Sequence, residues 1–299
     1  MKFRTEYKET PVYPPLDPTR PIVLIGSCFA SNIASKMREC QWNAYNGSGT
    51  LYNPMSIANV IRTMIFGGNT RDEVAASLFE SCGKIHSWLF DSHFSASTQE
   101  ECIEAIFNMR AELSAALKNA QALIVTFGTS WCYSLADHNV TDGSEYIVSN
   151  CHKMPSAMFR RRRLSVNEIS LSWIALCKRI KERFPDIRII FTVSPVRHLK
   201  DGFEGNTLSK ATLHLAVEQI CSSLDYCIYF PAYEIVCDDL RDYRFYANDL
   251  VHPSDSAIEY IWEIFRKTFI DDNGERILKD GNKRYKAMHH IPITRNSQQ

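Results

Sequence analysis

A serine and a cysteine stand side by side near the start of the chain, where an apolar segment gives way to a helical pattern. The segment PIVLIG, residues 21 to 26, is followed directly by Ser27 and Cys28. At the start of a helix, free backbone N–H groups and the helix dipole favour a thiolate or a developing oxyanion. Either residue is therefore a candidate nucleophile. The alternative is a simple turn in which Cys28 fills a small buried space.

A second pair of reactive side chains lies near the other end of the chain. In the stretch DLVHPSD, Asp249 and His252 are three residues apart, just before a helix that Pro253 can open. A loop of this kind lets the imidazole face a nucleophile while the carboxylate fixes its tautomer. Taken alone, the pair is more simply a helix-capping aspartate and an exposed histidine. Together with the turn at residues 26 to 28, it favours nucleophilic catalysis.

The elements that must position these residues alternate between strand and helix. Short apolar segments predict strands, and amphipathic or proline-initiated segments predict helices. This alternation predicts an α/β fold, a three-layer α/β/α sandwich with a mainly parallel, doubly wound sheet. The strands are expected at 21–26, 42–47, 122–128, 187–195 and 226–232, and the helices at 30–40, 54–66, 165–184 and about 258–269.

Two long stretches interrupt the alternation, at residues 67–115 and 136–163. Insertions at the carboxyl ends of parallel strands commonly build a binding cleft. No linker or repeat is apparent, so we expect a single domain over residues 1–299. Its core should span about 20–270, and a polar tail from about 272 to 299 is expected to lack fixed structure.

Several further residues could contact a substrate. Arg197 and His198 end the fourth strand, at the edge where such sheets bind ligands. Cys151 and His152 could form a thiol dyad or a metal site, but no second ligand pair occurs at zinc spacing, so no metal is expected. The run 160–163 of four arginines is most simply a solvated face. His86, Trp88 and His93 are expected to pack as aromatic residues or to line a cleft wall.

Composition limits the class of protein. The chain has 34 Lys and Arg against 34 Asp and Glu, so no overall field favours nucleic acid or an anionic membrane. The ten cysteines are scattered without a compact framework, which is typical of reduced thiols in a cytosolic protein. The first residues are charged, and no apolar run reaches the ~20 residues of a membrane span. A cytoplasmic protein is therefore expected.

The motifs resemble those of a known family. GSCFA at 26–30 is similar to the namesake motif of the GSCFA-domain family, within the SGNH (GDSL-type) hydrolase superfamily. Further blocks of the family occur in the same order: YNP at 52–54, TFGTSW at 126–131, NCHK at 150–153, SPVRH at 194–198 and DLVHPS at 249–254. The resemblance covers about residues 20 to 270. It implies an SGNH-type sandwich whose D-x-x-H block is Asp249 and His252, as orienting carboxylate and general base.

The resemblance also implies where this chain departs from the superfamily. The usual G-D-S block is Gly26, Ser27 and Cys28, so a cysteine stands at the serine position. We therefore expect Cys28 to attack and Ser27 to support the turn. The oxyanion hole normally uses a glycine N–H and an asparagine side chain; Asn53 could serve. The G-x-N-D block is replaced by four residues that become candidates for substrate contact: Gly128, Thr129, Ser130 and Trp131.

Two functions follow as hypotheses. The first is acyl transfer: an esterase, a deacetylase or an O-acyltransferase acting on a small ester, including acylated sugars, through an acyl-enzyme on Cys28 and without a cofactor. The second is a binding protein that keeps the cleft without turnover, supported by the altered nucleophile and oxyanion blocks. Retention of Asp249 and His252 favours the enzyme.

Overall fold

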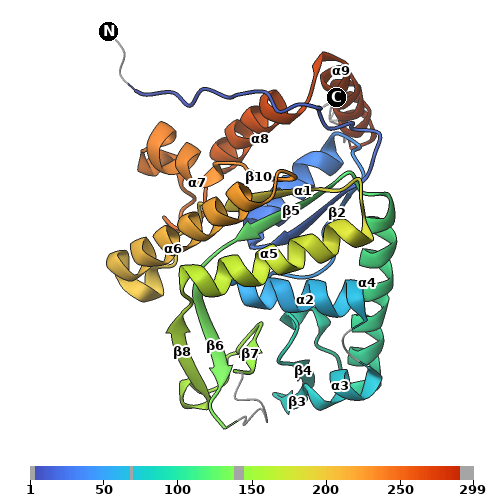
Figure 1. Cartoon of the computed structure of the whole chain (residues 1–299), viewed down its shortest axis with the longest axis vertical. Helices are drawn as coiled ribbons and strands as arrows, with labels where there is room; N and C mark the ends of the chain where they lie inside the picture. Colours follow the sequence, from blue (N-terminus) through green and yellow to red (C-terminus); the bar gives the residue numbers. More distant parts are fainter. Residues whose placement is uncertain (1–3, 68–69, 138–144, 290–299) are drawn as a thin grey trace, which may run out of the picture.

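A five-stranded parallel sheet forms the centre of the molecule. Figure 1 shows the computed structural model, which describes residues 4–67, 70–137 and 145–289. The strand order is β10-β9-β5-β1-β2, and every neighbouring pair is parallel. This confirms the predicted fold class. They are β1 (Ile22–Gly26), β2 (Ala44–Tyr45), β5 (Ala122–Phe127), β9 (Arg188–Val193) and β10 (Cys227–Tyr229).

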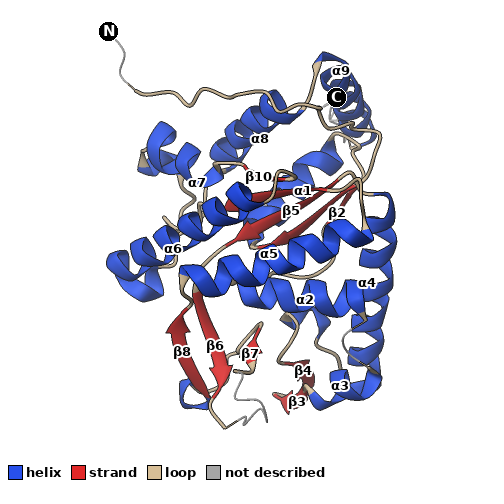
Figure 2. Cartoon of the chain, viewed as in Figure 1, coloured by secondary structure: helices blue, strands red, loops and turns tan. Residues whose placement is uncertain are grey.

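Helices cover both faces of this sheet, as the blue helices and red strands of Figure 2 make clear. Successive side chains of a strand point to opposite faces, so Val23 and Ile25 enter one core while Ile22 and Leu24 enter the other. The first core is closed by α2 (Pro54–Phe66), α4 (Gln99–Asn119), α5 (Val166–Arg183) and α6 (Gly202–Ser223). The second is closed by α1 (Cys28–Glu39), α8 (Asp255–Phe269) and α9 (Asp272–Met288).

Gly26 allows the chain to turn from β1 into α1. Its φ is +134°, and a Cβ atom there would lie 2.2 Å from the carbonyl oxygen of Thr126 on the neighbouring strand β5. Only glycine accepts both this backbone conformation and this close approach. The turn therefore fixes Ser27 and Cys28 at the carboxyl end of the sheet.

The two insertions form small elements beside the sandwich, in the lower part of Figure 1. The first contains α3 (Arg71–Ala76) and the hairpin of β3 (Leu78–Ser81) and β4 (Lys84–Ser87). The second pairs with the strand before it in an antiparallel sheet of order β7-β6-β8, and its residues 138–144 lie outside the described part. The strands of this sheet are β6 (Trp131–Leu135), β7 (Ile147–Val148) and β8 (Phe159–Arg163).

Short helical segments complete the chain. Single turns of 3-10 helix occur at Ser92–Phe94, Ser156–Met158, Leu199–Asp201 and Tyr243–Phe245. The short α7 (Ala232–Glu234) leads into a π-helical segment, Ile235–Leu240. Within the described ranges, no helix combines the length and the apolar character needed to cross a membrane.

The prediction of an unstructured tail from about residue 272 was wrong for most of that segment. Residues 272–288 form α9, whose first turn is capped by the Asp271 carboxylate, 2.8 Å from the Gly274 nitrogen. Leu278 is buried, and Gly281 packs so closely on the Cys40 carbonyl that a Cβ there would lie 2.0 Å from it. A few apolar or small residues on one face thus suffice to dock a polar helix. Residues 290–299 lie outside the described residues.

Candidate active site

Ser27 and Cys28 begin helix α1 at the carboxyl edge of the sheet. Ser27 is the N-cap residue, but its side chain makes no capping bond. Its buried hydroxyl has no hydrogen-bond partner among the described residues, and the residue is only 1% exposed. Cys28 is half-buried. The side chain that can still be reached from outside is thus that of Cys28.

The Cys28 thiol is less acidic than its place at a helix N-terminus predicts. Burial raises the pKa of Cys28 above the usual value, because desolvation outweighs the backbone N–H groups of Phe29 and Cys28 that would stabilise a thiolate. The Lys210 amine lowers the pKa of this thiol and the Asp249 carboxylate raises it. Cys28 is therefore a protonated thiol at neutral pH, and its attack on a carbonyl would require a base.

Asp249 and His252 form a hydrogen-bonded pair. The Nδ1 atom of His252 lies 2.6 Å from Oδ2 of Asp249. The other carboxylate oxygen, Oδ1, accepts bonds from the backbone nitrogens of Val251 at 2.9 Å and His252 at 3.0 Å. These three bonds, the backbone ones first, lower the pKa of Asp249 to about 2. Because an ionised carboxylate faces Nδ1, the proton of the neutral ring stays on Nδ1 and Nε2 is left as an acceptor.

Backbone contacts hold this loop against the end of the sheet. The Ala247 nitrogen donates to the His252 carbonyl at 2.7 Å, and Leu250 adopts a left-handed conformation with φ +59°. The Arg197 nitrogen, beyond the end of β9, donates to the Val251 carbonyl at 3.2 Å. The loop is thereby tied to the carboxyl edge of the sheet, the edge that also presents Cys28.

A cleft of about 530 Å³ opens beside this edge, between the second insertion and the loops after β5 and β9. Several predicted site residues lie on its wall, namely Asn53, Thr129, Trp131, Arg197, His198 and His252. The second insertion thus supplies part of the cleft wall, as expected, whereas no described residue of the first insertion, 67–115, lines it. The roles of the lining residues in catalysis or binding stay predictions.

Other predicted residues lie behind the cleft wall. Ser130 is fully buried, and both its nitrogen and its hydroxyl bond to Ser209 Oγ, at 2.8 and 3.2 Å. His152 was expected to contact substrate, but it packs against Phe79, Trp88 and His86 under the β3–β4 hairpin. His152 has a left-handed backbone, with φ +47°, and is not among the residues that line the cleft. Its neighbour Cys151 lines the cleft instead.

The groups expected to form an oxyanion hole already have partners. Asn53 caps α2 by accepting a bond from the Ser56 nitrogen at 2.9 Å, and its amide nitrogen donates to Ser56 Oγ at 2.8 Å. The Gly128 nitrogen donates to the Tyr52 carbonyl at 2.8 Å. The donors at the start of α1, the Cys28 and Phe29 amides, are those that face the thiol.

His198, which also lines the cleft, is a neutral group. Burial, with the nearby Lys210 and His252, lowers the pKa of His198 to about 4. Its ring meets that of Tyr52 edge to face, with centroids 5.9 Å apart. His198 therefore carries no charge at neutral pH.

Lys210, the most buried charged group near the site, was not predicted from the sequence. Lys210 lies on α6 and is 2% exposed, and its amine donates to the carbonyls of Gly128 at 2.7 Å and Ser194 at 2.6 Å. Burial lowers the pKa of Lys210 to about 7. One signal was present: Lys210 shares the helical spacing of the buried Leu213 and Val217, so it falls on an apolar stripe.

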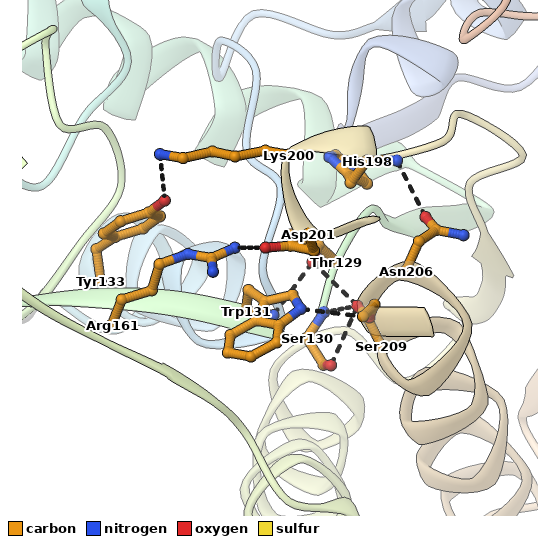
Figure 3. A network of polar contacts seen from close by, with 11 residues as sticks. Thr129, Ser130, Trp131, Tyr133, Arg161, His198, Lys200, Asp201, Asn206 and Ser209 are labelled. Atoms are coloured by element: carbon orange, nitrogen blue, oxygen red, sulfur yellow. Dashed lines mark hydrogen bonds and ion pairs between the residues drawn. The ribbon is translucent and has the colours of Figure 1, made fainter. Parts of the chain in front are cut away.

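The arginine run of β8 is also more than a solvated face. Arg161 stacks over the Trp131 ring, 4.3 Å from its centroid, and forms an ion pair with Asp201 (Figure 3). Lys200 donates to Tyr133 Oη at 3.0 Å on the same side of the cleft. These side chains line the cleft. The position of Arg161 there could not be predicted from the pattern of residues in its strand.

A larger hollow of about 1470 Å³ lies away from this edge, between residues 4 to 9 and the segment leading to α8. None of the predicted site residues lines it. Nowhere in the described ranges do three or more His, Cys, Asp or Glu side chains gather as metal ligands.

The chain belongs to the GSCFA family, whose sequence profile matches residues 21–265. This confirms the resemblance found in the motifs. No curated protein matches the chain.

Solved structures with a related fold include three proteins. A carbohydrate esterase family 2 enzyme from Corynascus thermopiles (Myceliophthora fergusii) is 12% identical, with 90% of this chain and 69% of that one covered and a TM-score of 0.41. A GDSL-like lipase from Parabacteroides merdae is 12% identical, with 84% and 96% covered and a TM-score of 0.40. An acetyl xylan esterase from Butyrivibrio proteoclasticus is 14% identical, with 88% and 66% covered and a TM-score of 0.40. These TM-scores are below 0.5, so no activity is transferred from them.

Proposed function

We propose that this protein is a hydrolase or acyltransferase of the SGNH type that forms an acyl-enzyme on Cys28 with small esters, including acylated sugars. The observation that carries the proposal is the Asp249–His252 pair, with 2.6 Å between carboxylate and imidazole. His252 lines the cleft, and its loop is tied to the sheet edge at which α1 begins. A general base, its orienting carboxylate and a nucleophile thus share one edge.

The proposed reaction uses the protonated thiol. Nε2 of His252 takes the Cys28 proton as the sulfur attacks the ester carbonyl, and the N–H groups of Cys28 and Phe29 stabilise the oxyanion. The alcohol then leaves with the proton held by His252, which produces a thioester on Cys28. Water or a second alcohol, deprotonated by His252, attacks the thioester and regenerates the thiol. A raised pKa of Cys28 makes the base essential to the first step.

A specific observation supports a second candidate function, ligand binding without turnover. Asn53 and the Gly128 nitrogen, the expected oxyanion donors, are engaged within the protein. The Gly128 N–H would then be unavailable to an oxyanion, and the Asn53 amide would have one N–H left. A protein with this site could hold an ester in the cleft without cleaving it.

Acyl-adduct formation separates the two candidates. Wild type, Cys28→Ala, Ser27→Ala and His252→Ala are incubated with para-nitrophenyl acetate or an acetyl thioester, and the intact mass of each protein is followed. We expect one acetyl group on wild type and on Ser27→Ala and none on Cys28→Ala. Acylation of His252→Ala should be slower by a factor on the order of hundreds or more. Equal acetylation of all four proteins would contradict the proposal.

A further inference from the structure

The cleft carries more positive charge than the molecule as a whole. Three cations line it, Arg161, Arg197 and Lys200, against one carboxylate, Asp201. The complete chain has equal numbers of basic and acidic residues. In the larger hollow near the N-terminus, the lining residues comprise five basic and five acidic side chains. The excess of cations is therefore a property of the cleft.

Arg161 is held in place by its surroundings. Its guanidinium lies over Trp131 and 5.3 Å from the centroid of the Tyr133 ring, and Asp201 fixes one edge of it. The Asp201 side chain is only 4% exposed, whereas that of Arg161 is 29% exposed. A guanidinium has five N–H donors, so a pair with one carboxylate leaves donors for a ligand.

Lys200 is placed on the same side of the cleft. Its amine donates to Tyr133 Oη (Figure 3). The hydrogen bond is 3.0 Å long, and the amine lies 5.4 Å from the centroid of the Tyr133 ring. Among the described residues, no carboxylate forms an ion pair with Lys200 or with Arg197. Burial raises the pKa of the Cys151 thiol, which also lines the cleft, to about 11, and the nearby charges of Lys200 and Arg161 act in the opposite direction. Two cations therefore act on one part of the cleft.

We propose that Arg161 and Lys200 form an oxyanion-binding subsite, so that the substrate of this cleft carries a carboxylate or phosphate group in addition to its ester. The proposal rests on the proposed function for the position of the ester. Binding of the anionic group by Arg161 and Lys200 does not require ester cleavage. An acidic or phosphorylated sugar ester has the required chemistry. Its anionic group would bind between Arg161 and Lys200 while the ester lies toward His252. The half-buried Trp131 and Tyr133, which line the cleft, would contact the sugar ring.

Physical chemistry favours an anion here over a neutral group. An oxyanion accepts charge-assisted hydrogen bonds from Arg161 and Lys200, and planar guanidinium matches carboxylate and phosphate geometry. A bound oxyanion also offsets the repulsion between the positive charges of Arg161 and Lys200. Both effects are screened by salt, over a Debye length of ~8 Å at physiological ionic strength.

The test uses matched probes that contain no ester. Calorimetric titration compares para-nitrophenyl β-D-glucuronide with para-nitrophenyl β-D-glucoside, which differ in a carboxylate against a hydroxymethyl group. Glucose 6-phosphate against glucose provides the phosphate arm. We expect each anionic probe to bind about tenfold more tightly than its neutral partner, and the preference to shrink as salt is added. Equal affinity within both pairs would overturn the proposal.

Variants assign the preference to the subsite. Lys200→Met is expected to weaken binding of the preferred anion about tenfold without changing binding of the neutral probe. Tyr133→Phe should have a smaller effect, because it frees the Lys200 amine without removing it. Lys178→Met, at an exposed position of α5, is the matched control and should behave as wild type. An unchanged anion preference in folded Lys200→Met would refute the assignment.

Ester cleavage is measured separately, so that the two proposals can fail independently. Phenyl acetate and its para-carboxylate, 4-acetoxybenzoate, are compared as substrates of wild type and Lys200→Met. Cleavage of both esters at equal rates, without an anion preference in binding, would overturn the subsite and leave the esterase proposal intact. Anion binding that depends on Lys200, without acylation of Cys28, would support the subsite and reject the proposed function.

Discussion

Replacing the buried Lys210 by methionine tests how this amine contributes to the sheet edge. The amine donates to the Gly128 and Ser194 carbonyls and lies near the thiols of Cys28 and Cys237. The centroid of the Tyr233 ring is 5.8 Å away. Two nearby histidines, His198 and His214, have lowered pKa values. No carboxylate is among these contacts. A charged ammonium here therefore loses its hydration without gaining an ion pair.

The expected change in the free energy of unfolding with pH follows from the pKa of Lys210. Burial lowers this pKa from 10.5 to about 7. Folding therefore costs about 5 kcal/mol more with the charged amine than with the neutral amine. Below pH 7 both states are protonated and the folded state carries the whole desolvation penalty. Above pH 7 the folded protein releases this proton while the unfolded chain keeps it up to about pH 10.5, so stability rises with pH. Between pH 7 and 9 the gain is about 2 kcal/mol.

Urea denaturation of wild type and Lys210→Met at several pH values from 6 to 9 measures this gain. Because the other titrating groups are common to both proteins, we expect the wild type to gain about 2 kcal/mol relative to the variant between pH 7 and 9. Lys178→Met, at an exposed lysine, serves as control and should run parallel to wild type. Parallel curves for wild type and Lys210→Met would refute the reasoning.

Three further outcomes are expected. Gly26→Ala should lower the free energy of unfolding by about 2–4 kcal/mol, because its Cβ would collide with the Thr126 carbonyl; an unchanged urea midpoint would contradict this. The rate of Cys28 alkylation by iodoacetamide, followed by peptide mapping, should be lower at pH 7 than that of free cysteine and still rise at pH 9, because burial raises the pKa of Cys28; fast labelling at pH 7 would be inconsistent with it. Asp249→Asn should slow acylation about a hundredfold or more, because the carboxylate that fixes the His252 tautomer is lost. Acylation rates equal to wild type would contradict an orienting role for Asp249.

The strands could be predicted because their signal is local. Runs such as ALIVTFG at 122–128 are apolar, β-branched and bounded by turn residues, and both faces of the strand are covered in the structure. The helices α6 and α9 could not be predicted as readily. In α6 the buried face includes Asn206, Ser209 and Lys210, so polar residues interrupt the apolar stripe. In α9 the contact with Cys40 is made by a glycine, which has no hydrophobic signature.

The sequence by itself determined which segments become strands and how Asp249 pairs with His252, because each depends on residues within a few positions of one another. The turn at Gly26 could also be predicted, although the close approach that requires glycine there is to Thr126, in a distant part of the chain. The tertiary structure decided which side chains face the cleft. At His152 the backbone is left-handed and the ring packs under the β3–β4 hairpin. Pairing of β6 with β8 brings Arg161 onto Trp131. The pKa of Cys28 was also decided there, because the desolvation of a thiol depends on neighbours distant in the chain and not on the helix that it begins.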